Sequence, residues 1–279
     1  MPLFRRPDGV PVPGLPPVRR IMPLLMPTRS ESVVWHEQLV DLTKTLPFID
    51  AWNASHDAPL TLFQLVLFAV GRTFHERPGM NRFVSGGRLY QRRGVQLSFA
   101  AKKAFDETAP IVTIKLELPK EADMSAFATM VRGAVSEGRT GPERAVDTEM
   151  RLATMLPVPV LSAALWLLRK LDEWNLMPAA MIRPDPMYAS AFLANLGSLG
   201  IDRTWHHLFE YGTVGLFAAV GVAGPGIVVG ASGEPEVRQL LSIRYTFDER
   251  VNDGFSAAKA LELVRRYLES PELLVAPKG

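Results

Sequence analysis

The heptapeptide Asp248–Glu249–Arg250–Val251–Asn252–Asp253–Gly254 lies near the C-terminus of this 279-residue chain. It follows a segment at 239–247 in which apolar and polar residues alternate, and this alternation predicts a strand. It precedes a segment at 256–269 whose apolar residues recur at helical spacing. A carboxylate such as that of Asp253 is favourable just before a helix, and Gly254 permits a tight turn. The heptapeptide therefore predicts a junction between a strand and a helix.

The rest of the chain mixes long strands with helices. Helical periodicity, together with the capping-box spacing of Thr61 and Gln64, predicts a helix at 60–76. A second helix is expected after Asp123, and residues 36–54 predict a strand that runs into a helix. Further strands are predicted at 94–101, 111–118, 214–222 and 227–230. Because the strands and helices follow no regular βαβ rhythm, the pattern favours an α+β sandwich.

Composition excludes several classes of function. The net charge is +2, from 31 basic and 29 acidic residues, so neither nucleic acid nor an anionic membrane is required as a partner. The chain has no cysteine, which excludes disulfides, thiolate nucleophiles and thiolate metal sites and fits a cytoplasmic protein. The longest apolar stretch, Met155–Leu168, is shorter than the roughly 20 residues that a transmembrane helix needs.

The N-terminal residues differ in composition from the rest. Six of the first 17 residues are proline. We therefore predict a proline-rich arm at 1–18 and a core domain at 19–279. The arm has two interpretations, a segment that exchanges between chains and a partly disordered tail.

Residues 150–189 form an apolar helical insertion. The helix predicted at 157–171 is apolar nearly all round, so it needs cover from other atoms. Another subunit, a partner groove, a membrane surface or the core of the same chain would each supply it. Only two basic residues lie in this helix, which supports membrane binding weakly. We favour a contact with a subunit or a protein partner through 155–171.

Five landmarks along the chain resemble one family. They are Arg20–Thr43, which ends in Asp-x-Thr, then Pro78–Asn81, Phe192–Gly200, the heptapeptide 248–254, and Leu268–Leu274. In this order they resemble the catalytic domain of the dihydrolipoamide acyltransferases, the core components of 2-oxoacid dehydrogenase complexes. The resemblance covers the chain from about Arg20 to Val275.

This resemblance implies a chloramphenicol-acetyltransferase-like fold, a two-layer sandwich of a mixed sheet flanked by helices. It also implies a homotrimer whose sites lie in channels between subunits, with coenzyme A entering one end and a lipoyl arm the other. Such trimers can build a larger cage. Family members carry lipoyl and subunit-binding modules before the core, whereas this chain starts almost at the core. We therefore expect no lipoyl or subunit-binding domain and no covalent lipoyl group here.

The resemblance also implies which residues perform acyl transfer. The second residue of the family signature is a histidine that acts as general base, and the serine before Asn-Leu-Gly stabilises the oxyanion. This chain has Glu249 and Ala194 at those positions, while Asn195 and Asp253 keep the family frame. A general base contributes ~10²–10⁴ in rate, and an oxyanion donor ~10²–10³. The two substitutions together therefore predict that standard transfer is lost or altered.

Other residues are candidates to replace the lost groups. A carboxylate with an ordinary pKa near 4.3 is a poor base for a thiol, but burial can raise the pKa of Glu249. The alternative is a carboxylate held by Arg250 or another basic group. His206 and His207 are alternative bases, or simply part of a hydrogen-bonded loop. They lack the spaced partners of a metal site, so no metal is expected.

A hydroxyl and several basic groups complete the candidate set. Ser198 is a candidate donor in place of Ala194, although serine is also common in turns. Lys102 and Lys103, with Arg88, Arg92 and Arg93, flank the strand at 94–101. They are candidates to bind the phosphates of coenzyme A, or they form a solvated hairpin.

Three functions remain open from the sequence. The first is an assembly scaffold or binding protein with an acyltransferase fold and no standard acyl transfer. The second is an active CoA-dependent acyltransferase that uses Glu249, His206 or His207 as base on an unknown acceptor. The third is a regulatory protein that binds an acyl-CoA without turnover.

Overall fold

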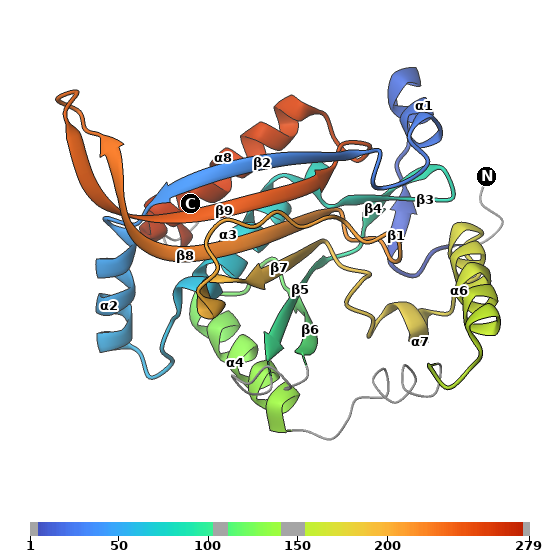
Figure 1. Ribbon diagram of the computed structural model, residues 1–279, viewed down its shortest axis with the longest axis horizontal. Coiled ribbons are helices and arrows are strands. Elements are labelled where there is room, and N and C mark those ends of the chain that lie inside the picture. The colour runs from blue at the N-terminus through green and yellow to red at the C-terminus, as the bar shows by residue number, and fades with distance from the viewer. Residues whose placement is uncertain (1–4, 103–110, 141–153, 276–279) are drawn as a thin grey trace.

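A six-stranded mixed sheet organises the chain (Figure 1). The computed structural model describes residues 5–102, 111–140 and 154–275. Strand β7 is parallel to both of its neighbours, and every other pair in this sheet is antiparallel. The strands lie in the order β2 (Val33–Asp41), β9 (Pro235–Asp248), β8 (Leu216–Val229), β7 (Ala191–Asn195), β5 (Val95–Lys102) and β6 (Ile111–Leu118).

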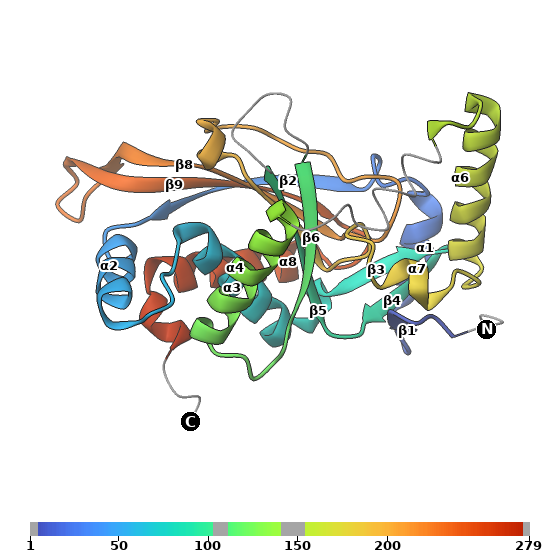
Figure 2. The same cartoon turned by 90° about the horizontal axis from the view of Figure 1, so that it is seen from below.

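Four helices cover one face of this sheet (Figure 2). They are α2 (Thr45–Ser55), α3 (Leu62–Glu76), α4 (Met124–Thr140) and α8 (Gly254–Glu269). The predicted capping box begins α3, where the Thr61 hydroxyl accepts from the Gln64 amide. The main apolar core lies between helices and sheet, with Leu97, Ile243 and Leu268 fully buried. The predicted two-layer sandwich with a mixed sheet is therefore confirmed.

The opposite face of β8 and β9 is covered by coil. Leu208 and Val214 pack there against Phe217 and Ala219. Alternation along an antiparallel strand usually leaves one face in water, but every residue of β9 from Leu241 to Asp248 is buried, so this part of the strand is covered on both faces. The polar row of β9 is therefore buried, and Thr246 donates to the carbonyl of His206 at 2.5 Å.

Strands β8 and β9 continue past the sheet as a two-stranded hairpin (Figure 1). The sequence predicted two separate strands at 214–222 and 227–230, and this was wrong. The glycines between them are accommodated in one strand, with a register shift between Val220 and Ala223. Near its tip, Ile227, Val229 and Val237 each expose at least three-quarters of their surface.

The N-terminal arm is held by a small second sheet. Strand β1 (Gly9–Pro11) pairs with β4 (Arg88–Arg92), which pairs with β3 (Arg82–Ser85). Arg6 is buried and contacts Asp8 at 2.9 Å and Asp172 at 2.8 Å. Because Asp172 belongs to α6 (Val158–Glu173), this arginine joins the arm to the apolar insertion.

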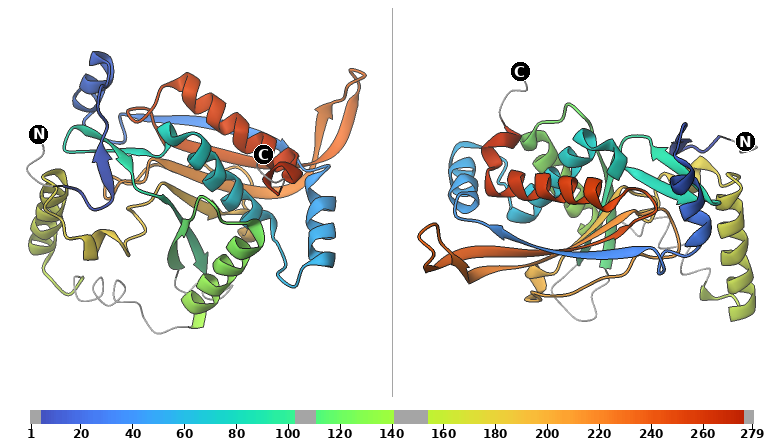
Figure 3. Two further views of the ribbon diagram at one scale, coloured as in Figure 1. Left: turned by 180° about the vertical axis from the view of Figure 1, so that it is seen from behind. Right: turned by 90° about the horizontal axis from the view of Figure 1, so that it is seen from above.

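Helix α6 stands at the end of the molecule opposite the hairpin tip (Figure 3). Val158, Trp166 and Leu167 on it are exposed. The interpretation of this segment as a core helix of the same chain is therefore wrong. A contact with another subunit, a partner groove or a membrane surface stays a prediction. No helix within the described residues is both long and apolar enough to cross a bilayer.

The remaining helices are short. Helix α1 (Pro17–Leu25) begins within the last two residues of the arm, and α7 (Ala179–Ile182) precedes β7. Three 3₁₀ turns complete the described chain, η1 (Pro78–Met80), η2 (Gly197–Leu199) and η3 (Pro271–Leu274).

Two glycines of β8 make a matched pair for testing the hairpin geometry. A Cβ at Gly221 would lie 2.3 Å from the backbone oxygen of Asp202, whereas a Cβ at Gly224 meets nothing within 4 Å. We expect Gly221→Ala to lower the free energy of unfolding by about 1–3 kcal/mol, because the backbone must shift. Gly224→Ala should change it by less than about 1 kcal/mol. Urea denaturation measures both, and equal effects would contradict the close approach.

Candidate functional site

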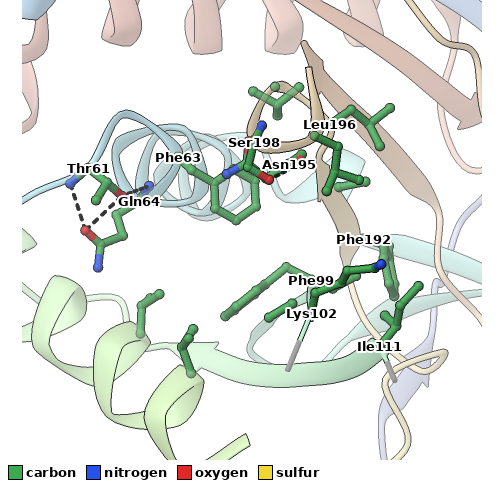
Figure 4. Close-up of a pocket in the computed structure, with 18 of the residues that line it drawn as sticks. Thr61, Phe63, Gln64, Phe99, Lys102, Ile111, Phe192, Asn195, Leu196 and Ser198 are labelled. Atoms are coloured by element: carbon green, nitrogen blue, oxygen red, sulfur yellow. Dashed lines mark hydrogen bonds between the residues drawn. The ribbon is translucent and has the colours of Figure 1, made fainter. Parts of the chain in front are cut away.

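A cavity of about 1030 Å³ opens within the described part of the chain (Figure 4). It lies between α4, the N-terminus of α3, the ends of β5 and β6, and the turn after β7. Its walls are mainly apolar, and five phenylalanines are among the lining residues. They are Phe63, Phe99, Phe192, Phe209 and Phe217.

The turn after β7 forms part of this wall. The Asn195 side chain accepts from the Ser198 amide at 3.3 Å, and the Ser198 hydroxyl donates to the Asn195 carbonyl at 2.8 Å. Gly200 has a φ of 74°, which favours glycine. The Ser198 hydroxyl is thus engaged in ordinary turn bonding, although the residue lines the cavity.

Ala194 precedes this turn and is half-buried in the cavity wall. It places a methyl group where the resemblance leads us to expect a hydroxyl. No hydrogen bond to a tetrahedral oxyanion can therefore come from this side chain.

Strand register separates Glu249 from Ala194 within one subunit. Ala194 lies beside Ala219 of β8, and Ala219 lies beside Arg244 of β9. Glu249 follows Arg244 by five positions in the chain. At 3.3–3.4 Å per residue, this places Glu249 about 17 Å along the strand direction from the row of Ala194. The two positions do not meet within this chain.

The side chain of Glu249 makes no hydrogen bond or ion pair to any described part of the chain. Only its backbone is engaged, because the amide donates to Ser32 at 2.9 Å and the carbonyl accepts from Arg19 at 3.0 Å. The interpretation that Arg250 holds this carboxylate is wrong. Arg250 binds Asp248 instead, through contacts of 2.9 and 2.7 Å.

The other signature residues have structural contacts. Asp248 and Arg250 are 1% and 3% exposed and form a bidentate pair. Asp253 is the N-cap of α8 and accepts from the Ser256 amide at 2.7 Å. This backbone hydrogen bond, with the charge of Arg19, holds the pKa of Asp253 below its usual range.

His206 lines the same cavity as Ala194 and Asn195. Its ring stacks on Phe217 with centroids 3.9 Å apart. Its Nδ1 lies 2.7 Å from the carbonyl of His207. A carbonyl only accepts, so Nδ1 carries the proton and a neutral ring has its lone pair on Nε2. Burial lowers the pKa of His206 below its usual value.

His207 is exposed and does not line the cavity. The structure therefore distinguishes the two candidate histidines, which the sequence could not do. Within the described residues, no group of metal-ligating side chains comes together.

The basic candidates do not form one cluster. Lys102 lies at the cavity, at one end of β5. Arg92 precedes the other end of β5 and is buried, with a 2.8 Å contact to the Thr213 carbonyl. Lys103 lies outside the described residues. Sequence reasoning missed Arg132 and Arg139, which line the cavity from α4. Their spacing of seven places both on one helix face and is a signal that could have found them.

Comparison with known proteins identifies the fold. Residues 182–276 match the family model for the 2-oxoacid dehydrogenases acyltransferase catalytic domain. A probable dihydrolipoamide acetyltransferase from Listeria monocytogenes is 16% identical with a TM-score of 0.60, and the match covers 93% of each chain. No curated protein sequence matches the chain.

Two further solved structures match this chain over their whole length. The Azotobacter vinelandii dihydrolipoamide acetyltransferase, studied for the catalytic roles of a serine, a histidine and an asparagine, is 16% identical with a TM-score of 0.61 over 95% of this chain and 100% of that chain. The cubic core of a pyruvate dehydrogenase multienzyme complex gives 16% and 0.62 over the same shares. The resemblance stated from five landmarks is confirmed: this chain has the fold of dihydrolipoamide acetyltransferase catalytic cores, and residues 182–276 match the 2-oxoacid dehydrogenase acyltransferase family.

Proposed function

We propose that this chain is a homotrimeric binding protein of the acyltransferase fold that lacks standard transfer between lipoyl groups and coenzyme A. Its ligand is an acyl thioester or a related acyl compound held in the cavity, and its trimers serve as an assembly scaffold. The observation that carries the proposal is the methyl group of Ala194 in the wall of a large, intact cavity.

The missing groups argue against standard transfer. The Azotobacter vinelandii enzyme was studied for the catalytic roles of a serine and a histidine. At the positions that resemble them, this chain has Ala194 and Glu249. The frame around Glu249 is intact, because Asp248 and Arg250 are paired and Asp253 caps α8. A frame that remains while the reacting groups are absent supports binding and assembly over catalysis.

Exposed apolar surface supports assembly. The hairpin tip presents Ile227, Val229 and Val237 on one side. Exposed apolar strands are unfavourable in an isolated monomer and mark contact sites. The separation of Glu249 from Ala194 also supports a site that two subunits share.

Transfer activity can be tested directly. We expect the chain to transfer no acetyl group from acetyl-CoA to dihydrolipoamide above background. Ala194→Ser with Glu249→His should raise the rate at least ~10²-fold over either single change, because an oxyanion donor and a base act as a unit. A coupled thiol-release assay measures this. Wild-type turnover that Glu249→Ala abolishes would contradict the proposal.

The trimer predicts a particular mass. Light scattering should give three times the 30.8 kDa of one chain, or a multiple of that trimer. Ile227→Asp should reduce the mass, because a carboxylate at an apolar contact is costly to desolvate. Met130→Asp is the control, since Met130 is an exposed apolar residue on α4. A stable wild-type monomer would refute the trimer.

One observation favours a second function, an acyltransferase that uses His206 as base. The neutral His206 ring has its lone pair on Nε2, within the same cavity as Ala194. The Phe217 stack and the bond from Thr246 to the His206 carbonyl fix its position. This geometry suits proton abstraction from a thiol or hydroxyl.

The second function predicts a pH dependence. Because burial lowers the pKa of His206, its ring becomes neutral at a lower pH than an ordinary histidine does. Turnover with an acyl-CoA panel should rise with pH through this lowered pKa and then level off. His206→Gln should abolish it, whereas His207→Gln keeps the backbone carbonyl and should retain it. Turnover that survives His206→Gln would exclude His206 as the base.

A further inference from the structure

The cavity is larger than a short acyl group requires. Its volume of about 1030 Å³ is at the upper end of the ~300–1,000 Å³ typical of small-molecule sites. An acetyl group would leave most of this volume empty or filled with water. The walls therefore accommodate a longer group.

The interior offers aromatic and aliphatic contacts. Phe63 and Phe99 meet edge to face with centroids 6.0 Å apart, and Phe192 stacks on Phe217 at 5.3 Å. These two pairs come from α3, β5, β7 and β8, and all four residues line the cavity. Figure 4 labels Phe63, Phe99 and Phe192. Ala194 adds its methyl group to this surface. Such a surface suits a flexible hydrocarbon chain.

Several polar side chains on the wall are already satisfied within the protein. The side-chain oxygen of Gln64 accepts from the backbone N–H of Thr61 at 2.8 Å, and its side-chain nitrogen donates to the Ala128 carbonyl at 3.1 Å. Asn195 and Ser198 bond each other's backbone. A ligand that is polar along its whole length would find few of the directional partners that its desolvation requires.

The charged lining residues all have one sign. Lys102, Arg132 and Arg139 line the cavity, and no described lining residue is acidic. Arg132 donates to the Pro59 carbonyl and the Thr129 hydroxyl, and Arg139 donates to the Lys102 carbonyl. Neither arginine pairs with a carboxylate of the described chain, so both guanidinium groups can bind an anion.

We propose that the cavity binds an amphiphile with a long aliphatic tail and an anionic head. The tail lies among the phenylalanines, and Arg132 and Arg139 bind the carboxylate or phosphate of the head. This inference rests on the proposed function and specifies its ligand class. A free fatty acid and a medium-chain acyl-CoA both have this chemistry.

Chain length is the discriminating variable. Calorimetry on the full chain compares acetyl-CoA with decanoyl-CoA, and acetate with decanoate. Each methylene that leaves water strengthens binding about fourfold, equivalent to about 0.8 kcal/mol. We expect decanoyl-CoA or decanoate to bind at least 100-fold more tightly than its two-carbon counterpart. Binding of decanoate shows that a carboxylate head suffices, and binding of decanoyl-CoA alone shows that the head needs the nucleotide phosphates.

Substitution of the two arginines tests whether their charge binds the anionic head of the ligand. Arg132→Gln with Arg139→Gln should weaken decanoate at least tenfold and leave uncharged decanol unchanged. Arg88→Gln is the matched control, because Arg88 is exposed on β4 and lies outside the cavity lining. Equal weakening of decanoate and decanol would overturn the assignment of the head to these arginines.

Blocking the tail site completes the test. Ala194→Trp should abolish binding of the ten-carbon ligands, because the indole fills the cavity. Val135→Trp, which fills it from the α4 wall, is the second variant for the case in which the first does not fold. Thermal unfolding verifies the fold of each. Equal affinity for acetyl-CoA and decanoyl-CoA would overturn the long tail and leave the proposed binding function standing. Absence of binding by every ligand at millimolar concentration would overturn both.

Discussion

The buried pair of Asp248 and Arg250 is the contact on which the signature region depends. Buried charges are tolerated only when they are paired and their remaining donors are bonded. Arg250 meets this condition, because its third nitrogen donates to the carbonyl of Met26 at 2.9 Å. The end of β9, the turn before α8 and the segment after α1 are therefore held together. The side chain of Glu249 takes no part in these contacts. The frame can thus be maintained by stability alone, whatever residue occupies position 249.

The sheet adds a second constraint. Strand β7 is short and parallel to β5 and β8, and it ends where the cavity opens. Its register fixes Ala194 in the row of Arg244, well short of Glu249. Chemistry that needs both positions therefore cannot occur within one copy of the chain. Chemistry or binding within one subunit must instead use what the cavity itself contains, which includes His206 but not Glu249.

Local signals predicted much of the fold. The capping box, the helical periods and the alternating strands identified α3, α8, β5 and β6, and the five landmarks identified the family fold. Contacts between distant residues decided what local signals could not. Pairing with β9 keeps β8 continuous through its glycines. Coil that precedes β8 covers the polar row of β9, where Thr246 donates to the His206 carbonyl and Arg244 lies over the Trp205 ring.

In the candidate site, too, local sequence signals identified some residues and contacts between distant residues placed the others. The two substitutions could be identified by resemblance, but their separation depends on register. The position of His206 depends on Phe217 and Thr246, which no spacing in the sequence connects to it. Lys102 and Arg92 flank one strand in sequence and therefore lie near its opposite ends. Arg132 and Arg139 were accessible to helical spacing, because seven residues return to nearly the same face.

The substitution at Ala194 links the loss of one property to the gain of another. A serine hydroxyl in an aromatic wall would need a hydrogen-bond partner, and without one its desolvation would weaken apolar binding. Alanine removes that cost together with the oxyanion donor. The same methyl group that argues against tetrahedral chemistry completes an apolar surface between Phe192 and the Asn195 turn. Diminished acyl transfer and binding of an aliphatic tail are then two consequences of one side chain. A serine at position 194 should therefore raise the rate of transfer and weaken binding of the tail.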